Sequence, residues 1–313
     1  MNEMAQITAA LVKELRDSTG AGMMDAKKAL VESDGDMEAA VDWLRAKGLS
    51  KAAKKSGRTA ADGLVAALIS EDGKTGALVE LNAETDFVAR NDQFQDALRS
   101  VAAVALTTDG TTEGLAGAPA PEGEGSVSDM ITRMVATIGE NMSLRRTAKL
   151  SVEAGAVTSY MHSPVVEGLG KIGVIVALES AANSDKLAEV GKKVAMHIAA
   201  TSPAAATVDE LDPALVEKEK AFLTEQARES GKPENIIENM IKGRIKKFFK
   251  EVVLAEQQFV MNPDQTVAQF IEEEGKAAGS EIKLAGFARY ALGEGIEKKE
   301  EDFAAEVAAA TGG

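Results

Sequence analysis

The stretch "GLVAALISEDGKTGALVELNAETDFVARND" (63–92) contains the pattern that decides the fold. Two apolar runs, 63–70 and 77–83, flank a polar turn that contains two glycines, and this arrangement predicts a β-hairpin. A helix over 91–106 is expected next, because it opens with Asn-Asp, a typical helix start.

An unusual element, "TDFV" (85–88), stands between this hairpin and this helix. Phe87 and Val88 lie among charged residues there, and both are expected to be exposed. One interpretation is structural: Thr85 or Asp86 caps a turn, and Phe87 plugs the end of the sheet. The other is that the element contacts a partner. The residues of this stretch leave both interpretations open.

The order of hairpin and helix recurs further along the chain. A second hairpin is expected over 156–180 and a second helix over 184–200, which indicates an internal duplication. The first copy is four residues longer than the second, at the place where "TDFV" stands. The copies align at Gly76 with Gly173, Leu81 with Leu178, Asp92 with Asp185 and Val101 with Val194.

Three short helices are expected ahead of the first hairpin, over 7–20, 23–35 and 37–48. Thr8 and Asp36 are typical N-caps for the first and the third of them. The basic stretch that follows is either a linker or a solvated helix end. The small core that these helices share is expected to consist of Leu11, Leu15, Leu30, Val41 and Leu44.

The remaining segments are less regular. Gly, Thr and Pro dominate 107–125, which predicts a flexible loop. A helix at about 128–141 and a strand at 145–154 are expected to follow it. A helix and a final strand within 266–295 are expected to complete a second sheet, and the tail 297–313 is typical of a short amphipathic helix.

Two long helices, over 214–230 and 234–254, are separated only by the turn "GKP". They are therefore expected to form an antiparallel helical hairpin. The residues expected to face each other across this hairpin are Leu215, Phe222, Ile237, Met240, Ile241 and Ile245.

Composition limits the classes of function. The chain of 313 residues has a net charge of −15, although residues 1–60 taken alone have a net charge of +1. This acidic balance argues against direct nucleic-acid binding and favours a protein partner. The absence of cysteine excludes disulfides and thiolate metal sites. No apolar run is long enough to span a membrane and no signal peptide is recognisable, so a cytoplasmic protein is expected.

No motif of catalysis or metal binding is recognisable. The only histidines, His162 and His197, have no acid or nucleophile at a known spacing, and we expect both to be structural or surface residues. The acidic clusters Glu272–Glu274 and Glu300–Asp302, and the basic run 243–247, are interpreted as solvated helix faces. No catalytic residue and no metal site is predicted.

Several long motifs of this chain are nevertheless typical of one family: "LVKELRDSTGAGMMDAKKAL" (11–30), "LVELNAETDFVARNDQF" (78–94), "IGENMSLRR" (138–146), "AMHIAA" (195–200), "SGKP" (230–233), "GRIKKF" (243–248) and "GEGIEKKEEDFAAEVAA" (293–309). Through these motifs the chain resembles bacterial elongation factor Ts. The similarity covers essentially the whole chain, with departures only at 109–125 and 163–169.

This resemblance implies an α+β fold of several parts. An N-terminal, ubiquitin-associated-like domain of three helices precedes a core of two related α+β subdomains, from which an antiparallel helical hairpin protrudes, and a helical module ends the chain. The implied boundaries are 1–56 for the first domain with its linker, 57–142 for the first core subdomain, 143–210 and 251–292 for the second, 211–250 for the hairpin and 293–313 for the C-terminal module.

The resemblance also implies a function that is not enzymatic. Members of this family are guanine-nucleotide exchange factors that bind the translation GTPase elongation factor Tu in its GDP-bound and nucleotide-free forms. They disturb its Mg²⁺ site and promote GDP release so that GTP can rebind. Thr85, Asp86, Phe87 and Val88 would displace the Mg²⁺ of the partner, and no cofactor, membrane or nucleic acid is implied for this chain.

A second group, Arg16, Met23, Met24 and Lys27, is implied to contact the GTPase through the first domain. Adjacent residues at a helix start point in different directions, so one of Met23 and Met24 is expected in the core and the other exposed. A homodimer or a two-to-two complex stays open. So do an adaptor whose three-helix domain binds ubiquitin-like or nascent-chain partners, and an enzyme with an unrecognised carboxylate pair.

Overall fold

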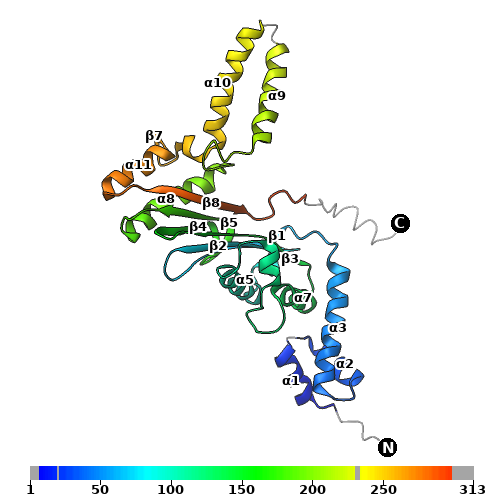
Figure 1. Cartoon of the computed structure of the whole chain (residues 1–313). Helices are drawn as coiled ribbons and strands as arrows, with labels where there is room; N and C mark the ends of the chain where they lie inside the picture. Colours follow the sequence, from blue (N-terminus) through cyan, green and yellow to red (C-terminus); the bar gives the residue numbers. More distant parts are fainter. Residues whose placement is uncertain (1–6, 20, 230–232, 298–313) are drawn as a thin grey trace, which may run out of the picture.

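The structure is a computed structural model that describes residues 7–19, 21–229 and 233–297. It has an α+β fold in which antiparallel strands form one sheet, ordered β3-β2-β1-β5-β4, with β8 also paired to β5 (Figure 1). Both predicted hairpins are confirmed. The strands of this sheet are β1 (Asp62–Ile69), β2 (Thr75–Ala83), β3 (Met142–Ser151), β4 (Gly155–Val166), β5 (Leu169–Glu179) and β8 (Lys283–Ala291).

The two halves of this sheet meet at a corner. Strands β1 and β5 pair only at Val65 with Gly170 and at Ala66 with Leu169. From that corner the β1-β2-β3 half packs face to face on the β4-β5-β8 half, with an apolar inner layer between them that includes Val65, Leu78, Val157 and Ile175. The expectation of a separate second sheet is therefore wrong, because β8 pairs with β5 in the same sheet that contains β1, β2 and β3.

Helices cover the outer faces of the two halves (Figure 1). Helices α5 (Asp92–Ala105) and α7 (Val127–Ile138) pack on the first half, and α8 (Ser184–Thr201) and α11 (Val267–Ala278) pack on the second. The central strands are thus buried on both faces, which explains why their sequences are almost continuously apolar.

The aligned residues of the duplication occupy equivalent places. Leu81 and Val101 lie in the outer core of the first half, and Leu178 and Val194 lie in that of the second.

Two pairs of glycines support the same correspondence. Gly63 and Gly155 each have positive φ, and a Cβ on either would collide with a backbone oxygen, that of Leu81 in the first half and that of Leu178 in the second.

The aligned glycines Gly76 and Gly173 face the inner layer. A Cβ on Gly76 would lie 2.6 Å from Cγ1 of Val157, and one on Gly173 would lie 2.8 Å from Cγ1 of Val65. Each glycine therefore makes room for a valine of the opposite half.

The three-helix unit is confirmed as α1 (Ala9–Thr19), α2 (Met23–Glu32) and α3 (Met37–Lys55). Both predicted caps are present: Thr8 Oγ1 accepts from the Leu11 amide, and Asp36 Oδ1 accepts from the Ala39 amide. Helix α3 is longer than predicted, so the basic stretch begins as a helix end, and α3 packs along α7. The placement of Val41 in the core was wrong, since its side chain is exposed, while Leu15 and Leu30 are fully buried.

Three further differences concern connections. The loop predicted at 107–125 contains helix α6 (Thr112–Gly117), which forms because Thr111 caps it and Leu115 is fully buried in the core. A small hairpin of β6 (Gln258–Phe259) and β7 (Asn262–Thr266) was not predicted. Strand β3 begins at Met142 and pairs with β2, whereas the domain boundary after residue 142 stays a prediction.

The helical hairpin consists of α9 (Pro213–Glu229) and α10 (Glu234–Val252), followed by the short helix η1 (Leu254–Glu256). On α10 the prediction is confirmed: Ile237 is buried, and Met240, Ile241 and Ile245 are half-buried. On α9 it is wrong by one residue. Leu215 and Phe222 are exposed, and the neighbouring Val216 and Leu223 are turned inward.

The helix predicted for the tail, with Glu300–Asp302, lies outside the described residues except for residue 297. Among the helices that the structure does describe, none is both long and apolar enough to span a membrane.

A buried carboxylate ties the end of β8 to the first half of the sheet. Glu80, on β2, has no exposed surface. Its Oε1 accepts from Arg145 Nη1 (3.0 Å) and from the Gly293 amide (2.8 Å), and its Oε2 accepts from Arg146 Nε (2.6 Å). The Arg146 guanidinium also lies over the ring of Tyr290, 4.2 Å from its centroid. Burial alone would raise the pKa of Glu80, but the Gly293 amide and the two guanidiniums outweigh it and hold the pKa below its usual value of 4.5.

Glu80→Gln is expected to lower the free energy of unfolding by about 3 kcal/mol at pH 7, because it leaves two guanidiniums without their carboxylate. The native pKa lies below the unfolded one, so this stabilisation is present above about pH 4.5 and is lost as the pH falls below it. Urea unfolding at pH 7 and between pH 4.5 and 3 measures both effects. Glu281→Gln, at an exposed acid, is the control, and an acid dependence in Glu80→Gln as steep as in the control would contradict the role given to Glu80.

Gly173→Val is expected to overfill the inner layer and to destabilise the protein by roughly 1–3 kcal/mol. The matched control is Gly243→Ala in α10, where nothing lies within 4 Å of the added Cβ. This control is expected to leave stability unchanged or to raise it by up to about 1 kcal/mol. Urea-unfolding midpoints compare the two variants, and equal midpoints would show that the halves are not closely packed at Gly173.

Candidate functional site

The extra residues of the first copy form a separate element. Helix α5 is capped by Asn91 and helix α8 by Asn183, so the connection after Leu81 is five residues longer than the one after Leu178. This is one residue more than the sequence alignment indicated. The longer connection contains the one-turn helix α4 (Asp86–Ala89), which carries Phe87.

Helix α4 has one buried side and one exposed side. Val88 and Ala89 are buried in the core of the first half, so the expectation that Val88 is exposed was wrong. Phe87 is 79% exposed, the largest exposed fraction among the large apolar side chains in the described part of the chain. The interpretation in which Phe87 plugs the end of the sheet is therefore wrong as well. Successive residues of a helix point about 100° apart, so anchoring Val88 directs Phe87 toward solvent.

The polar groups of α4 are bound within the chain. Asp86 Oδ2 accepts from Arg90 Nη2 at 2.8 Å, and the Ala89 carbonyl accepts from Gln95 Nε2 at 3.1 Å. Thr85 is the N-cap residue of α4, but neither its hydroxyl nor the Asp86 side chain caps the helix. The Thr85 hydroxyl donates to Glu140 Oε1 instead, at 2.8 Å. The interpretation in which Thr85 or Asp86 caps the turn is therefore wrong.

Two carboxylates bracket the start of α4. The β2–β3 ladder ends with Ala83 opposite Met142, so the next residues of the two strands also face each other. Beyond the last backbone pair, Glu140 Oε2 accepts from the Thr85 amide at 3.0 Å, and Glu84 Oε1 accepts from the Asn141 amide at 2.5 Å. We call these four residues, 84–85 and 140–141, the carboxylate bracket. The two side chains extend the ladder where the backbone pairing stops.

The bracket was missed in the sequence, although its two halves stand in "AETDFV" and "IGENMS". The signal that reveals it is the pairing of the end of β2 with the start of β3, which no local pattern shows.

The end of α3 meets the same bracket. Arg58 Nη1 lies 3.5 Å from Glu84 Oε2, and the Arg58 carbonyl accepts from Asn141 Nδ2 at 2.7 Å. Lys55 Nζ donates to the Gly139 carbonyl in the adjoining turn. The bracket therefore joins the first sheet half, the Phe87 turn and the segment that leads from the three-helix unit.

The second predicted group lies on the three-helix unit, apart from α4. Met23 and Met24 are 62% and 76% exposed, so the expectation that one of them lies in the core was wrong. The buried side of α2 begins three residues later, at Ala26, which leaves both methionines beyond the small core. Lys27 is exposed on the same helix, and Arg16 on α1 is half-buried.

One histidine is structural and the other lies on the surface, as expected: His197 is buried and His162 is exposed. His197 is buried, its Nε2 lies 2.9 Å from Gln257 Oε1, and its Nδ1 accepts from the Val260 amide. Burial lowers the pKa of His197, which keeps the ring neutral. His162 lies in β4, where its Nδ1 is 3.2 Å from the Tyr160 hydroxyl.

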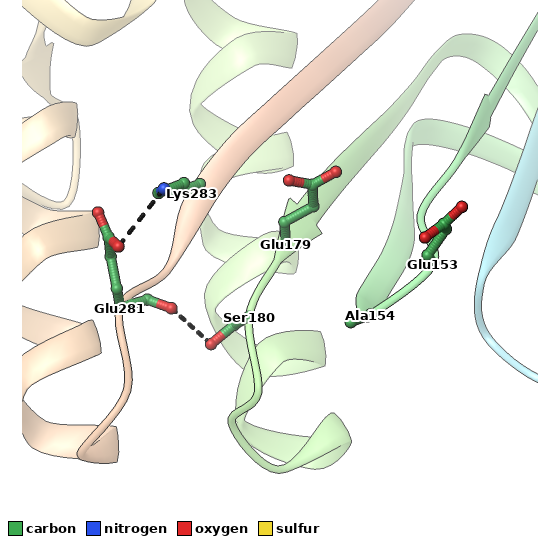
Figure 2. Close-up of a pocket in the computed structure, with 6 residues that line it drawn as sticks. All are labelled: Glu153, Ala154, Glu179, Ser180, Glu281 and Lys283. Atoms are coloured by element: carbon green, nitrogen blue, oxygen red, sulfur yellow. Dashed lines mark hydrogen bonds and ion pairs between the residues drawn. The ribbon is translucent and has the colours of Figure 1, made fainter.

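A cavity of about 420 Å³ lies at the other end of β2 from Phe87, where Val152 N donates to the Lys74 carbonyl. Figure 2 shows Glu153, Glu179 and Glu281 around it, with Lys283 paired to Glu281. The carboxylates do not converge, and Glu281 is exposed. Among the residues that the structure describes, no group of three or more acidic or histidine side chains is arranged to hold a metal ion.

The geometry thus presents an exposed aromatic ring on a turn whose other side chains are bound within the chain. Such a turn can insert an apolar side chain into a pocket of another molecule.

Comparison with known proteins identifies one family. The family model described as elongation factor TS matches residues 84–294. Elongation factor Ts of Hyphomonas neptunium is 65% identical over 310 residues, which cover 99% of this chain and all of the relative. The proteins of the same name from Rhizobium etli and Caulobacter vibrioides are 59% and 58% identical over 99% of this chain. The chain therefore belongs to the elongation factor Ts family and is a translation elongation factor.

Proposed function

We propose that this chain is the guanine-nucleotide exchange factor of elongation factor Tu. It binds the GDP-bound GTPase, disturbs its Mg²⁺ site and releases GDP so that GTP can rebind. The observation that carries this proposal is the exposure of Phe87 on a turn whose other side is anchored in the core. An exposed phenylalanine ring contributes no burial energy to the stability of the free protein, but it contributes that energy when a partner buries it.

In such a partner, the oxygen coordination of the Mg²⁺ ion is easily disturbed. Mg²⁺ requires a nearly ideal octahedral shell of oxygens, and in GTPases it is bound together with the nucleotide phosphates. A ring that enters beside the ion displaces the loop that supports this shell. Asp86 is exposed next to Phe87 and adds a polar contact that orients the ring, while Thr85 and Val88 hold the turn in this chain.

Energy considerations require further contacts. Full burial of one phenylalanine contributes roughly 1.5–3 kcal/mol. Accelerating GDP release by about 10⁴ requires about 5.5 kcal/mol. The difference is assigned to other surfaces that hold the complex together, and Arg16, Met23, Met24 and Lys27 are proposed to form one of them. Coupling between the factor and the nucleotide is reciprocal, so the ratio of GTP to GDP sets the direction of exchange and the factor sets its rate.

Phe87→Ala is expected to lower the maximal rate of GDP release by about 10- to 100-fold, because the burial energy of the ring is lost. Stopped-flow release of a fluorescent GDP from elongation factor Tu, at increasing concentrations of the variant, measures this rate.

The matched control is Phe222→Ala, which truncates another exposed phenylalanine on α9 and is expected to release GDP at the wild-type rate. Normal release by Phe87→Ala would overturn the role of Phe87. An adaptor without exchange activity would already fail with the wild-type chain, because release would stay at its intrinsic rate.

The double variant Met23→Ala/Met24→Ala is expected to raise the factor concentration at half-maximal release by about tenfold, because two exposed apolar contacts are lost. The maximal rate is expected to change by less than about twofold, since the Phe87 turn is untouched. Val41→Ala, another exposed apolar residue of the three-helix unit, is the control. A fall of the maximal rate without a change in half-saturation would assign the methionines to the release step rather than to docking.

A further inference from the structure

We propose that Glu140 is a positioning residue for exchange: through Thr85 it holds the turn that presents Phe87. This inference rests on the proposed function. Glu140 lies in the connection between α7 and β3, more than fifty positions from Phe87 along the chain, and it is not one of the residues of "TDFV".

Both oxygens of Glu140 are directed at one residue. Oε1 accepts from the Thr85 hydroxyl at 2.8 Å, and Oε2 accepts from the Thr85 amide at 3.0 Å. Bonds to an ionised carboxylate are stronger than bonds between neutral groups. Because Thr85 is the residue from which α4 starts, Glu140 fixes both the position and the direction in which that helix begins.

Helix α4 needs this support because it is a single turn. A helix of four residues is not stable by itself, since nucleation costs more than one turn of hydrogen bonds returns. Val88 anchors its middle in the core, and Gln95 binds the carbonyl of Ala89 at its end. Its start has Glu140 in place of the side-chain cap that Thr85 does not supply. Without Glu140 the turn would pivot about Val88, and Phe87 would sample many directions.

The second half of the sheet provides an internal comparison. Among the described residues, the shorter connection after β5 contains no one-turn helix and receives no side-chain carboxylate from the segment that precedes β8. There, Ser180 Oγ accepts from the Ala182 amide and donates to the Glu281 carbonyl. The contact made by the Glu140 carboxylate therefore occurs in the copy that has the added turn, and it is not a feature of the hairpin that both copies share.

Hydrogen exchange of the free chain tests the positioning without any partner. In Glu140→Ala the Thr85 amide loses its acceptor and is expected to exchange about tenfold faster or more. Glu140→Gln keeps one acceptor oxygen, so an intermediate rate is expected. The control is Glu122→Gln, at an acid that makes only an exposed pair with Arg133. Unchanged exchange at residues 85–88 in both Glu140 variants would overturn the inference.

Release kinetics test the consequence for function. With elongation factor Tu and fluorescent GDP, Glu140→Ala is expected to lower the maximal release rate by about tenfold while half-saturation changes by less than about twofold. Glu140→Gln is expected to lie between Glu140→Ala and the wild type, and circular dichroism verifies that both variants are folded. A residue with only a structural role would move half-saturation and stability together with the rate.

A double-mutant cycle with Phe87 separates the two proposals. Since Glu140 acts through Phe87, Glu140→Ala is expected to add almost nothing to Phe87→Ala, and losses that multiply would overturn the positioning role. A wild-type chain that does not accelerate release would refute the proposed function, and normal release by Phe87→Ala would refute the role of Phe87. Normal release by Glu140→Ala beside a defective Phe87→Ala would refute only the inference about Glu140.

Discussion

The pairing of β2 with β3 is the constraint on which the rest of the structure depends. Strand β2 is buried on both faces, so a shift of one residue would exchange its side chains between the inner layer and the outer core, neither of which they would fit. The register that avoids this places Ala83 opposite Met142. It thereby fixes where the chain leaves the sheet and which residues face each other just beyond it, and the carboxylate bracket and the Phe87 turn follow.

The duplication shows which part of this arrangement serves the fold and which part does not. Both halves contain a hairpin with a positive-φ glycine on which a Cβ would collide with the carbonyl oxygen of an equivalent leucine, and both contain a glycine that admits a valine from the other half. Only the first half adds α4, and in the described part of the chain only its connection is held at the start by a carboxylate, that of Glu140 from the α7–β3 connection. Since the second half folds without them, the added turn and its support are available for a role outside the protein.

Much of the fold was predictable because it is encoded locally. Apolar runs around glycine turns revealed both hairpins, and Thr8, Asp36 and Asn91 marked helix starts by their capping chemistry. The errors arose where a segment distant in the sequence determines which side chains are buried. Helix α9 has adjacent apolar pairs, Leu215 with Val216 and Phe222 with Leu223, and only α10 selects the buried member of each. At the site, residues 85–88 were predicted, but the burial of Val88 and the contribution of Glu140 depend on the core and on the β2–β3 register, which a single sequence does not display.

The central claim is that a ring held away from its own protein enters the magnesium pocket of elongation factor Tu. The most direct measurement is a structure of the nucleotide-free complex of the two proteins. Our account predicts that the Phe87 ring lies against apolar side chains of the GTPase beside its empty Mg²⁺ position, while Thr85 stays bonded to Glu140. A complex in which Phe87 points into solvent or folds back on its own chain would contradict it.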